Sequence, residues 1–67
     1  MEEIYVVVYR EDNTEYTEEY EDFEDARVDY FHRVNGDLGS YDYVVLQQVL
    51  IEDNEETINI IGEEFYN

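Results

Sequence analysis

The side chains able to act as a nucleophile or a general base are scarce in this chain, apart from carboxylates. His32 is the single histidine, Ser40 is the single serine, and there is no cysteine. A catalytic triad needs a nucleophile held against a positioned base, whereas His32 stands beside Arg33 in a segment rich in acids. We interpret His32 as a surface histidine near the C-terminal end of a helix, where the helix dipole favours cations. We therefore predict no catalytic residues and no enzymatic activity.

Carboxylates are abundant, but their distribution favours neither acid–base catalysis nor a metal site. Catalysis needs one carboxyl in an apolar pocket, and most of these acids fall in hydrophilic runs. The nearest approach to a calcium-binding loop starts at Asp53 and has Glu64 at its twelfth position. Ile58 stands at the sixth position, where the sharp turn of such a loop requires glycine. There is no phosphate-binding glycine loop either, so we predict no metal and no cofactor.

The outstanding property of the chain is its negative charge. Twenty acids face three bases, for a formal net charge of -17, and solubility alone is met by a magnitude of about 2–8. Nine acids fall between positions 11 and 25 with no base among them: Glu11, Asp12, Glu15, Glu18, Glu19, Glu21, Asp22, Glu24 and Asp25. Retaining so many like charges destabilises a small fold, so a function that needs the field is indicated. Direct binding to nucleic acid is opposed, because phosphates would meet a polyanion.

The elements that position these acids follow from the apolar pattern. High charge alone is typical of disorder, but 43% of the residues are hydrophobic and they fall in ordered patterns. The predicted elements are strands at 4–9 and 14–20, a helix at 23–34, and strands at 41–51 and 57–61. We expect one domain, 1–67, of the α+β class, with order ββαββ and a four-stranded antiparallel sheet carrying the helix on one face.

Local signals mark the ends of these elements. Asn13 is able to adopt positive φ in the first turn, Asp22 is a plausible N-cap, and Asn35-Gly36 is a strong helix stop. Gly62 indicates a bulge in the last strand or its end. The predicted apolar stripe of the helix, at spacings of three and four, comprises Phe23, Ala26, Tyr30, Phe31 and Val34.

The first and third strands are apolar on both faces, which one helix cannot cover. In the first strand, Val6 and Val8 alternate with Val7 and Tyr9; the third strand behaves likewise. An exposed apolar sheet face usually marks an interface. We therefore expect a homodimer, or a docking face for a target protein. The alternative is that the tyrosines, Gln47 and Gln48 tolerate water and the face stays open. No apolar run approaches the ~20 residues of a membrane span, so we expect no membrane partner and a cytoplasmic location.

In size, charge, the cluster of acids from Glu11 to Asp25 and its interleaved tyrosines, the sequence resembles small acidic DNA-mimic proteins. Many of these are phage-encoded inhibitors of host DNA-binding enzymes. The resemblance implies a phage counter-defence or host-takeover factor that acts in the host cytoplasm. It would occupy the basic DNA-binding groove of a DNA-binding protein or nuclease. The nine clustered acids would contact that groove, with Tyr16 and Tyr20 as anchors among them.

A second hypothesis is an acidic adaptor, antitoxin-like or assembly protein. Its apolar sheet face would bind a partner protein, while the acids solvate the complex or steer its formation. The two hypotheses differ in salt dependence. Binding by a DNA mimic would collapse with salt and compete with DNA, whereas binding by the adaptor would survive salt and be lost with apolar substitutions.

Overall fold

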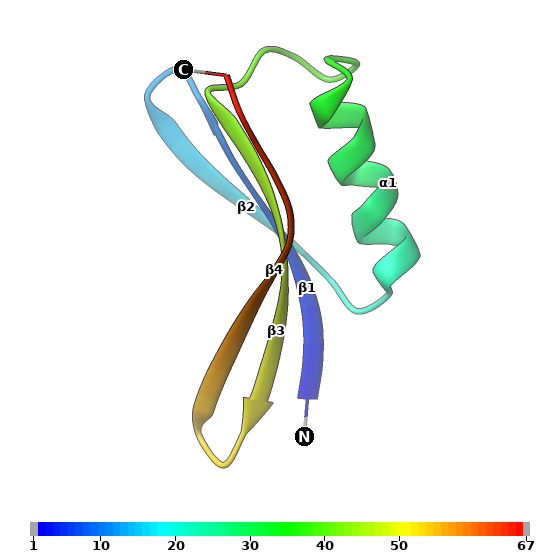
Figure 1. Cartoon of the computed structure of the whole chain (residues 1–67), viewed down its shortest axis with the longest axis vertical. Helices are drawn as coiled ribbons and strands as arrows, with labels where there is room; N and C mark the ends of the chain where they lie inside the picture. The colour runs from blue at the N-terminus through cyan, green and yellow to red at the C-terminus, as the bar shows by residue number, and fades with distance from the viewer. Residues whose placement is uncertain (1, 67) are drawn as a thin grey trace.

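The computed structural model describes residues 2–66, which form one antiparallel sheet and one helix (Figure 1). The elements are β1 (Glu2–Glu11), β2 (Thr14–Tyr20), α1 (Phe23–Val34), β3 (Tyr43–Glu52) and β4 (Glu55–Phe65). The strand order is β2-β1-β3-β4, with each neighbouring pair antiparallel. The predicted α+β class and ββαββ order are confirmed. None of the described helices is both long and apolar enough to cross a lipid bilayer.

Three of the four predicted strands have the wrong boundaries, and cross-strand pairing explains why. β1 is two residues longer at each end than predicted, and β4 runs from Glu55 to Phe65 rather than from 57 to 61. Glutamates disfavour strands only weakly, and near the end of a strand their side chains reach the solvent while the backbone pairs with the neighbouring strand. Tyr41 precedes β3 instead of starting it, although its ring is buried in the core.

Both hairpins close through a two-residue turn of the same kind. Asp12 and Asn13 have φ values of 53° and 65°, and Asp53 and Asn54 have 51° and 68°. Two consecutive residues at positive φ match the twist of the flanking strands, and Asp and Asn tolerate that conformation better than most residues. The predicted turn with positive φ at Asn13 is confirmed, and the second turn is shorter than predicted.

The helix begins and ends where its capping residues stop it, as predicted. The Asp22 side chain accepts a hydrogen bond from the backbone N–H of Glu24 at 2.9 Å. At the other end, Gly36 has φ +82° and donates to the carbonyl of Arg33, while Asp37 donates to the carbonyl of His32. This pair of bonds satisfies carbonyls that the last helical turn leaves open.

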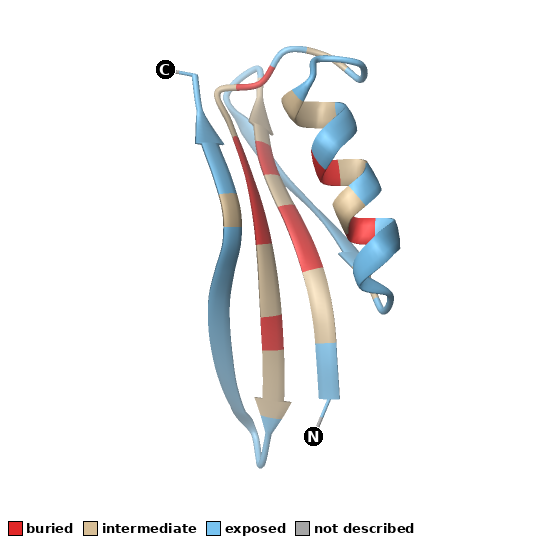
Figure 2. Ribbon diagram, turned by 45° about the vertical axis from the view of Figure 1, so that its right-hand side comes forward, coloured by how far each residue is buried: buried red, intermediate tan, exposed pale blue. Residues whose placement is uncertain are grey.

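The core lies between α1 and one face of the sheet (Figure 2). It comprises Val7, Tyr9, Val44 and Leu46 from the sheet, Ala26 and Tyr30 from α1, and Tyr41 from the loop before β3. The predicted stripe is partly wrong, because Phe31 is 46% exposed and Phe23 is 36% exposed. Ala26, Tyr30 and Val34 do face the sheet, and Asp29 and Arg33 share their side of the helix.

The opposite face of the sheet carries no helix, and we call it the open face. Its apolar side chains are Ile4, Val6, Val8, Tyr43, Val45, Val49, Ile51, Ile58, Ile60 and Phe65, as the strand register requires. Val6, Val45 and Val49 are nevertheless buried, because neighbouring side chains on the two central strands cover them. Ile58, Ile60 and Phe65 on the outer strand β4 are all more than half exposed.

A bulge in β4 lies next to the point where the ring of Tyr30 reaches this strand. Leu46 pairs with Gly62 and Gln47 pairs with Ile60, so Ile61 has no partner in register. A Cβ atom at Gly62 would lie 3.0 Å from the hydroxyl oxygen of Tyr30, so glycine leaves room for the tyrosine ring from α1. The bulge is one of the two possibilities that Gly62 raised in the sequence.

Candidate partner-binding surface

The predicted acidic cluster occupies one continuous margin of the molecule, which we call the acidic edge. It comprises Glu11, Asp12, Glu15, Glu18, Glu19, Glu21, Asp22, Glu24 and Asp25. They lie at the end of β1, in the first hairpin turn, on β2, and at the start of α1. All of them except Glu11, which is half-buried, are exposed. The fold brings them together because β2 is an outer strand that leads directly into the helix.

Strand alternation divides the carboxylates of β2 between the two sides of the sheet. Glu18 pairs with Val7 and therefore lies on the helix side, together with Tyr16 and Tyr20. Glu15 and Glu19 pair with Arg10 and Val6 and lie on the open face. The acidic edge thus presents negative charge to both sides of β2 rather than along a single line.

The few cations of the protein are engaged mainly outside the acidic edge. Arg10 lies 3.7 Å from Asp42, Arg33 lies 2.5 Å from Asp29, and His32 lies 3.0 Å from Asp37. Arg27 pairs with Glu24 at 2.8 Å, and this bond lowers the pKa of the Glu24 carboxyl. Within residues 2–66, Glu24 is therefore the one member of the acidic edge with an ion pair. The other eight carboxylates of the acidic edge have no cation partner among the described residues.

Tyrosine hydroxyls hold two of these carboxylates in place. Tyr43 donates a hydrogen bond to Glu15, and this bond, followed by partial burial, raises the pKa of the Tyr43 hydroxyl. Tyr9 donates to Glu18 at 3.4 Å, and its ring stacks on that of Tyr16 with centroids 5.4 Å apart. Neither hydrogen bond removes charge from a carboxylate, so both orient it without neutralising it.

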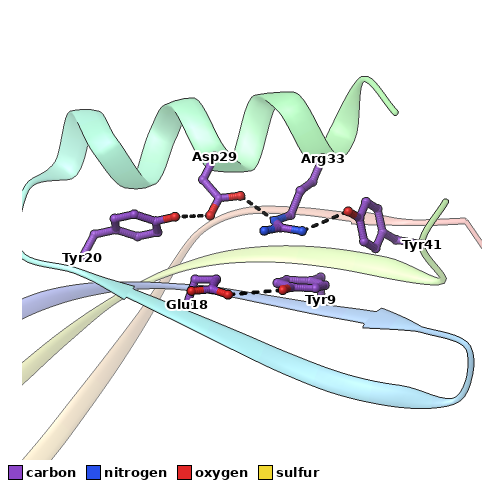
Figure 3. Close-up of polar contacts among 6 residues, drawn as sticks. All are labelled: Tyr9, Glu18, Tyr20, Asp29, Arg33 and Tyr41. Carbon is purple, nitrogen blue, oxygen red and sulfur yellow. Dashed lines mark hydrogen bonds and ion pairs between the residues drawn. The ribbon is translucent and has the colours of Figure 1, made fainter. Parts of the chain in front are cut away.

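A polar network lies between α1 and the sheet, directly behind the acidic edge (Figure 3). Asp29 accepts hydrogen bonds from Tyr20 and from Arg33, and Arg33 donates in turn to the hydroxyl of Tyr41 at 2.9 Å. The Arg33 guanidinium also lies 3.7 Å from the centroid of the Tyr9 ring. The Asp29 and Arg33 side chains are only 8% and 13% exposed. Their charges are therefore paired away from most of the solvent.

This network shifts the ionisation of its members. Burial, followed by the hydrogen bond to Asp29, raises the pKa of Tyr20 to about 12. Burial alone would lower the pKa of Arg33, but the hydrogen bond and charge of Asp29 outweigh it and raise this pKa. Tyr20, predicted as an anchor on the surface, is half-buried and engaged in this structural role. Tyr16, the other predicted anchor, is 44% exposed.

The sequence interpretation missed the pairing of Asp29 with Arg33. It placed Arg33 near the C-terminal end of the helix, where the helix dipole favours cations, and gave Asp29 no role. The spacing of four residues was a usable signal, because side chains at i and i+4 lie on the same helix face. What the spacing does not show is that this pair faces the sheet rather than the solvent. That orientation depends on packing against Tyr9 and Tyr41.

A pocket of about 310 Å³ opens at the end of α1. Its walls are Arg33, Val34, Asn35, Gly36, Gly39, Ser40, Tyr41 and Tyr66. The Tyr66 hydroxyl donates to the carbonyl of Val34 at 3.1 Å. Ser40 lines the pocket, whereas the described lining does not include His32, whose exposed ring faces Asp37. Over residues 2–66, no three His, Cys, Asp or Glu side chains are grouped to hold a metal ion.

Comparison with protein families, curated proteins and solved structures finds no match in any of the three. The function is therefore argued from the surface itself. Its two extended features are the acidic edge, along β2 and the start of α1, and the apolar side chains of the open face, on β1, β3 and β4.

Proposed function

We propose that this protein is an acidic DNA mimic that binds the basic DNA-binding groove of a DNA-binding protein or nuclease and inhibits it. The observation that carries the proposal is the charge of the acidic edge: of its nine acids, all of them described, Glu24 is the one member with a cation partner. A groove that binds DNA presents arginines and lysines to phosphates, and exposed carboxylates on an outer strand offer those cations an alternative. Inhibitors encoded by phages act in this way on host enzymes, and we place this chain in that role.

The dimensions of the acidic edge suit this role. β2 has seven residues, which at a rise of about 3.3 Å each span roughly 20 Å. The same distance along a duplex covers about six base pairs at 3.4 Å each. Carboxylates on both sides of β2 meet cations on both walls of a groove, as the two phosphate rows of a duplex do.

Local structure prepares the acidic edge for binding. Glu15 and Glu18 are held by tyrosine hydroxyls, so less side-chain freedom is lost when a partner cation arrives. Tyr16 is held on the ring of Tyr9 and remains 44% exposed, which makes it the tyrosine best placed to anchor the contact. Asp22 and Glu24 are fixed by the first turn of α1.

The test neutralises one part of the surface without altering the fold. We would replace Glu15, Glu18, Glu19 and Glu21 by Gln, and Asp22 by Asn. Asn caps a helix as well as Asp does, and Gln still accepts the hydrogen bonds of tyrosine, so the fold should persist. Immobilised parent protein would capture partners from a bacterial lysate at low salt. Among the captured proteins we expect DNA-binding proteins that added duplex DNA displaces. The five-fold variant should not capture these proteins.

The matched control removes the same charge elsewhere. Replacing Glu52, Glu55, Glu56 and Glu63 by Gln, and Asp53 by Asn, changes the net charge equally but leaves the acidic edge intact. This variant should bind a captured partner almost as tightly as the parent. For that partner, the acidic-edge variant should show a lower association rate and a flatter dependence of affinity on salt. Equal binding by the two variants and the parent, at low and at physiological salt, would refute mimicry at this surface.

The open face favours a second candidate function, that of an acidic adaptor, antitoxin-like or assembly protein. Ten apolar side chains on this face lack a covering element, and Ile58, Ile60 and Phe65 are more than half exposed. An adaptor would bind through these side chains, and its binding would survive high salt and resist competition by DNA. Loss of binding on replacing Phe65 by Ser, with no effect of the five-fold amide variant, would select this function.

A further inference from the structure

The two outer strands of the sheet differ in where they carry the charges that protect a free backbone edge. β2 and β4 lie at the ends of the order β2-β1-β3-β4, so each pairs on one side only within the described chain. Three of the seven residues of β2 are glutamates, and charged side chains are a usual defence against strand addition. In β4, residues 57–62 (Thr-Ile-Asn-Ile-Ile-Gly) include no charged residue and no proline.

The free edge of β4 is accessible along its first half. Figure 2 shows β4 at the side of the sheet away from α1, with nearly its whole length exposed. In Figure 1 the end of the β3–β4 hairpin also extends past the helix. Ile58, Ile60 and Ile61 are 53%, 51% and 46% exposed. The bulge at Ile61 interrupts the strand, so residues 55–60 form its longest regular stretch, and pairing with β3 resumes at Gly62.

We propose that the free edge of β4 binds an extended segment of a partner protein, with an apolar centre and basic residues on both sides, as a fifth strand. Backbone hydrogen bonds would supply affinity, and the exposed isoleucines would select apolar side chains at the centre. Glu55 and Glu56 precede the uncharged stretch, and Glu63 and Glu64 follow it. These two acid pairs are the reason for requiring basic residues at both ends of the segment.

The same charges argue against a second copy of this chain at this edge. In an antiparallel pair of β4 strands centred on Asn59 and Ile60, Glu55 and Glu56 of one copy would face Glu64 and Glu63 of the other. Neighbouring strands lie only about 4.8 Å apart, and like charges directly opposite each other destabilise a sheet. A basic segment would convert the same four contacts into favourable ones.

A designed peptide tests this proposal on the intact protein. The probe has the sequence Lys-Lys-Val-Thr-Val-Thr-Val-Lys-Lys with blocked ends. We expect hydrogen exchange of alternate backbone amides in residues 55–60 to slow by about tenfold or more on saturation, with no change in β2. A peptide of the same sequence with N-methyl groups on the pairing edge keeps its side chains but lacks the donors. It should bind at least about tenfold more weakly.

One substitution made on each outer strand supplies the matched variants. Thr57→Lys places a lysine on the free edge of β4, and Thr17→Lys makes the same change on β2; both threonines are exposed. We expect Thr57→Lys to weaken peptide binding by about tenfold and Thr17→Lys to change it by less than about threefold. If Thr57→Lys does not fold, the N-methylated peptide on the unaltered chain decides the question.

Several results would overturn the proposal. These are no binding of the probe at about 1 mM, equal binding of the N-methylated peptide, or protection of β2 instead of β4. Protection of β4 by rising concentrations of the protein alone would show that a second copy occupies the edge. The proposal does not rest on DNA mimicry. The five-fold amide variant keeps all four flanking acids of β4, so it should still bind the probe even where it has lost its captured partners.

Discussion

The Asp29 carboxylate lies 2.5 Å from the Nε atom of Arg33, one helical turn further along α1, and the pair faces the sheet. The second carboxylate oxygen accepts a hydrogen bond from Tyr20 on β2, and Arg33 reaches Tyr41 and the ring of Tyr9. One ion pair therefore joins the helix to the strand that carries the acidic edge (Figure 3). Of the three basic residues of the protein, Arg33 is thus largely buried in this pair.

Removing one partner of this pair should unfold the protein. Arg33→Ala leaves Asp29 buried without its cation, and breaking a buried pair costs about 3–5 kcal/mol. A chain of this size has roughly 3–5 kcal/mol of net stability, so the variant should be largely unfolded at 25 °C. Circular dichroism during urea unfolding measures the change. Arg27→Ala, which breaks an exposed pair, is the control and should cost less than about 1 kcal/mol.

Replacing both partners by apolar residues should restore much of the loss. Asp29→Leu combined with Arg33→Met leaves no buried charge, and such replacements are often neutral or stabilising. We expect the double variant to be more stable than Arg33→Ala by about 2 kcal/mol or more. A double variant as unstable as Arg33→Ala would show that packing of Arg33 on Tyr9, rather than charge pairing, is what the helix requires.

Stability should fall in alkali as Tyr20 ionises. Burial and the hydrogen bond to Asp29 raise the pKa of Tyr20 from 10.0 to about 12, so folding favours the neutral phenol. This contribution is fully present below pH 10 and is lost as the pH rises through about 12. In Tyr20→Phe, the free energy of unfolding should decline less steeply across this window, and one late tyrosine should disappear from the absorbance titration. Equal slopes in the two proteins would contradict the assignment.

Salt should stabilise the folded state. The net charge is -17, and repulsion between exposed carboxylates is screened beyond about 8 Å at physiological ionic strength. We expect the thermal midpoint to rise by several degrees between low and moderate NaCl at pH 7, since about 1 kcal/mol shifts it by 4–8 °C in a domain of this size. The rise should be smaller in the five-fold amide variant. A flat or falling midpoint in the parent would mean that its repulsion is already compensated.

The isolated protein should form a dimer at micromolar concentrations through its open face. Phe65 is 60% exposed on this face and its ring lies beside that of Tyr43, whereas Phe31 is 46% exposed on the helix. Phe65→Ser should raise the dimer dissociation constant by about tenfold or more, and Phe31→Ser should leave it nearly unchanged. Light scattering measures both. If the protein is a monomer throughout the micromolar range, a second copy does not cover the open face.

Features set by neighbouring residues were predictable from the sequence alone. The bounds of α1 follow from the Asp22 cap and from Gly36, whose backbone adopts the positive φ that ends the helix. β2 was located correctly, as was the turn with positive φ at Asn13. Each of these depends on interactions within a few residues of the chain, so composition and spacing determine it. The negative charge itself, and its concentration between positions 11 and 25, are properties of the sequence alone.

Tertiary structure alone decided which strands are neighbours and which side chains are in contact. Residues far apart in the chain set the order β2-β1-β3-β4, which makes β2 and β4 the outer strands. The same is true of the hydrogen bond from Tyr43 to Glu15, which are separated by 28 positions. In the sequence, Asp29 and Arg33 are indistinguishable from exposed polar residues of a surface helix. In the fold they face the sheet, where Asp29 contacts Tyr20 and Arg33 contacts Tyr41. Local preferences cannot specify such contacts, because their free energy depends on burial that exists only in the assembled fold.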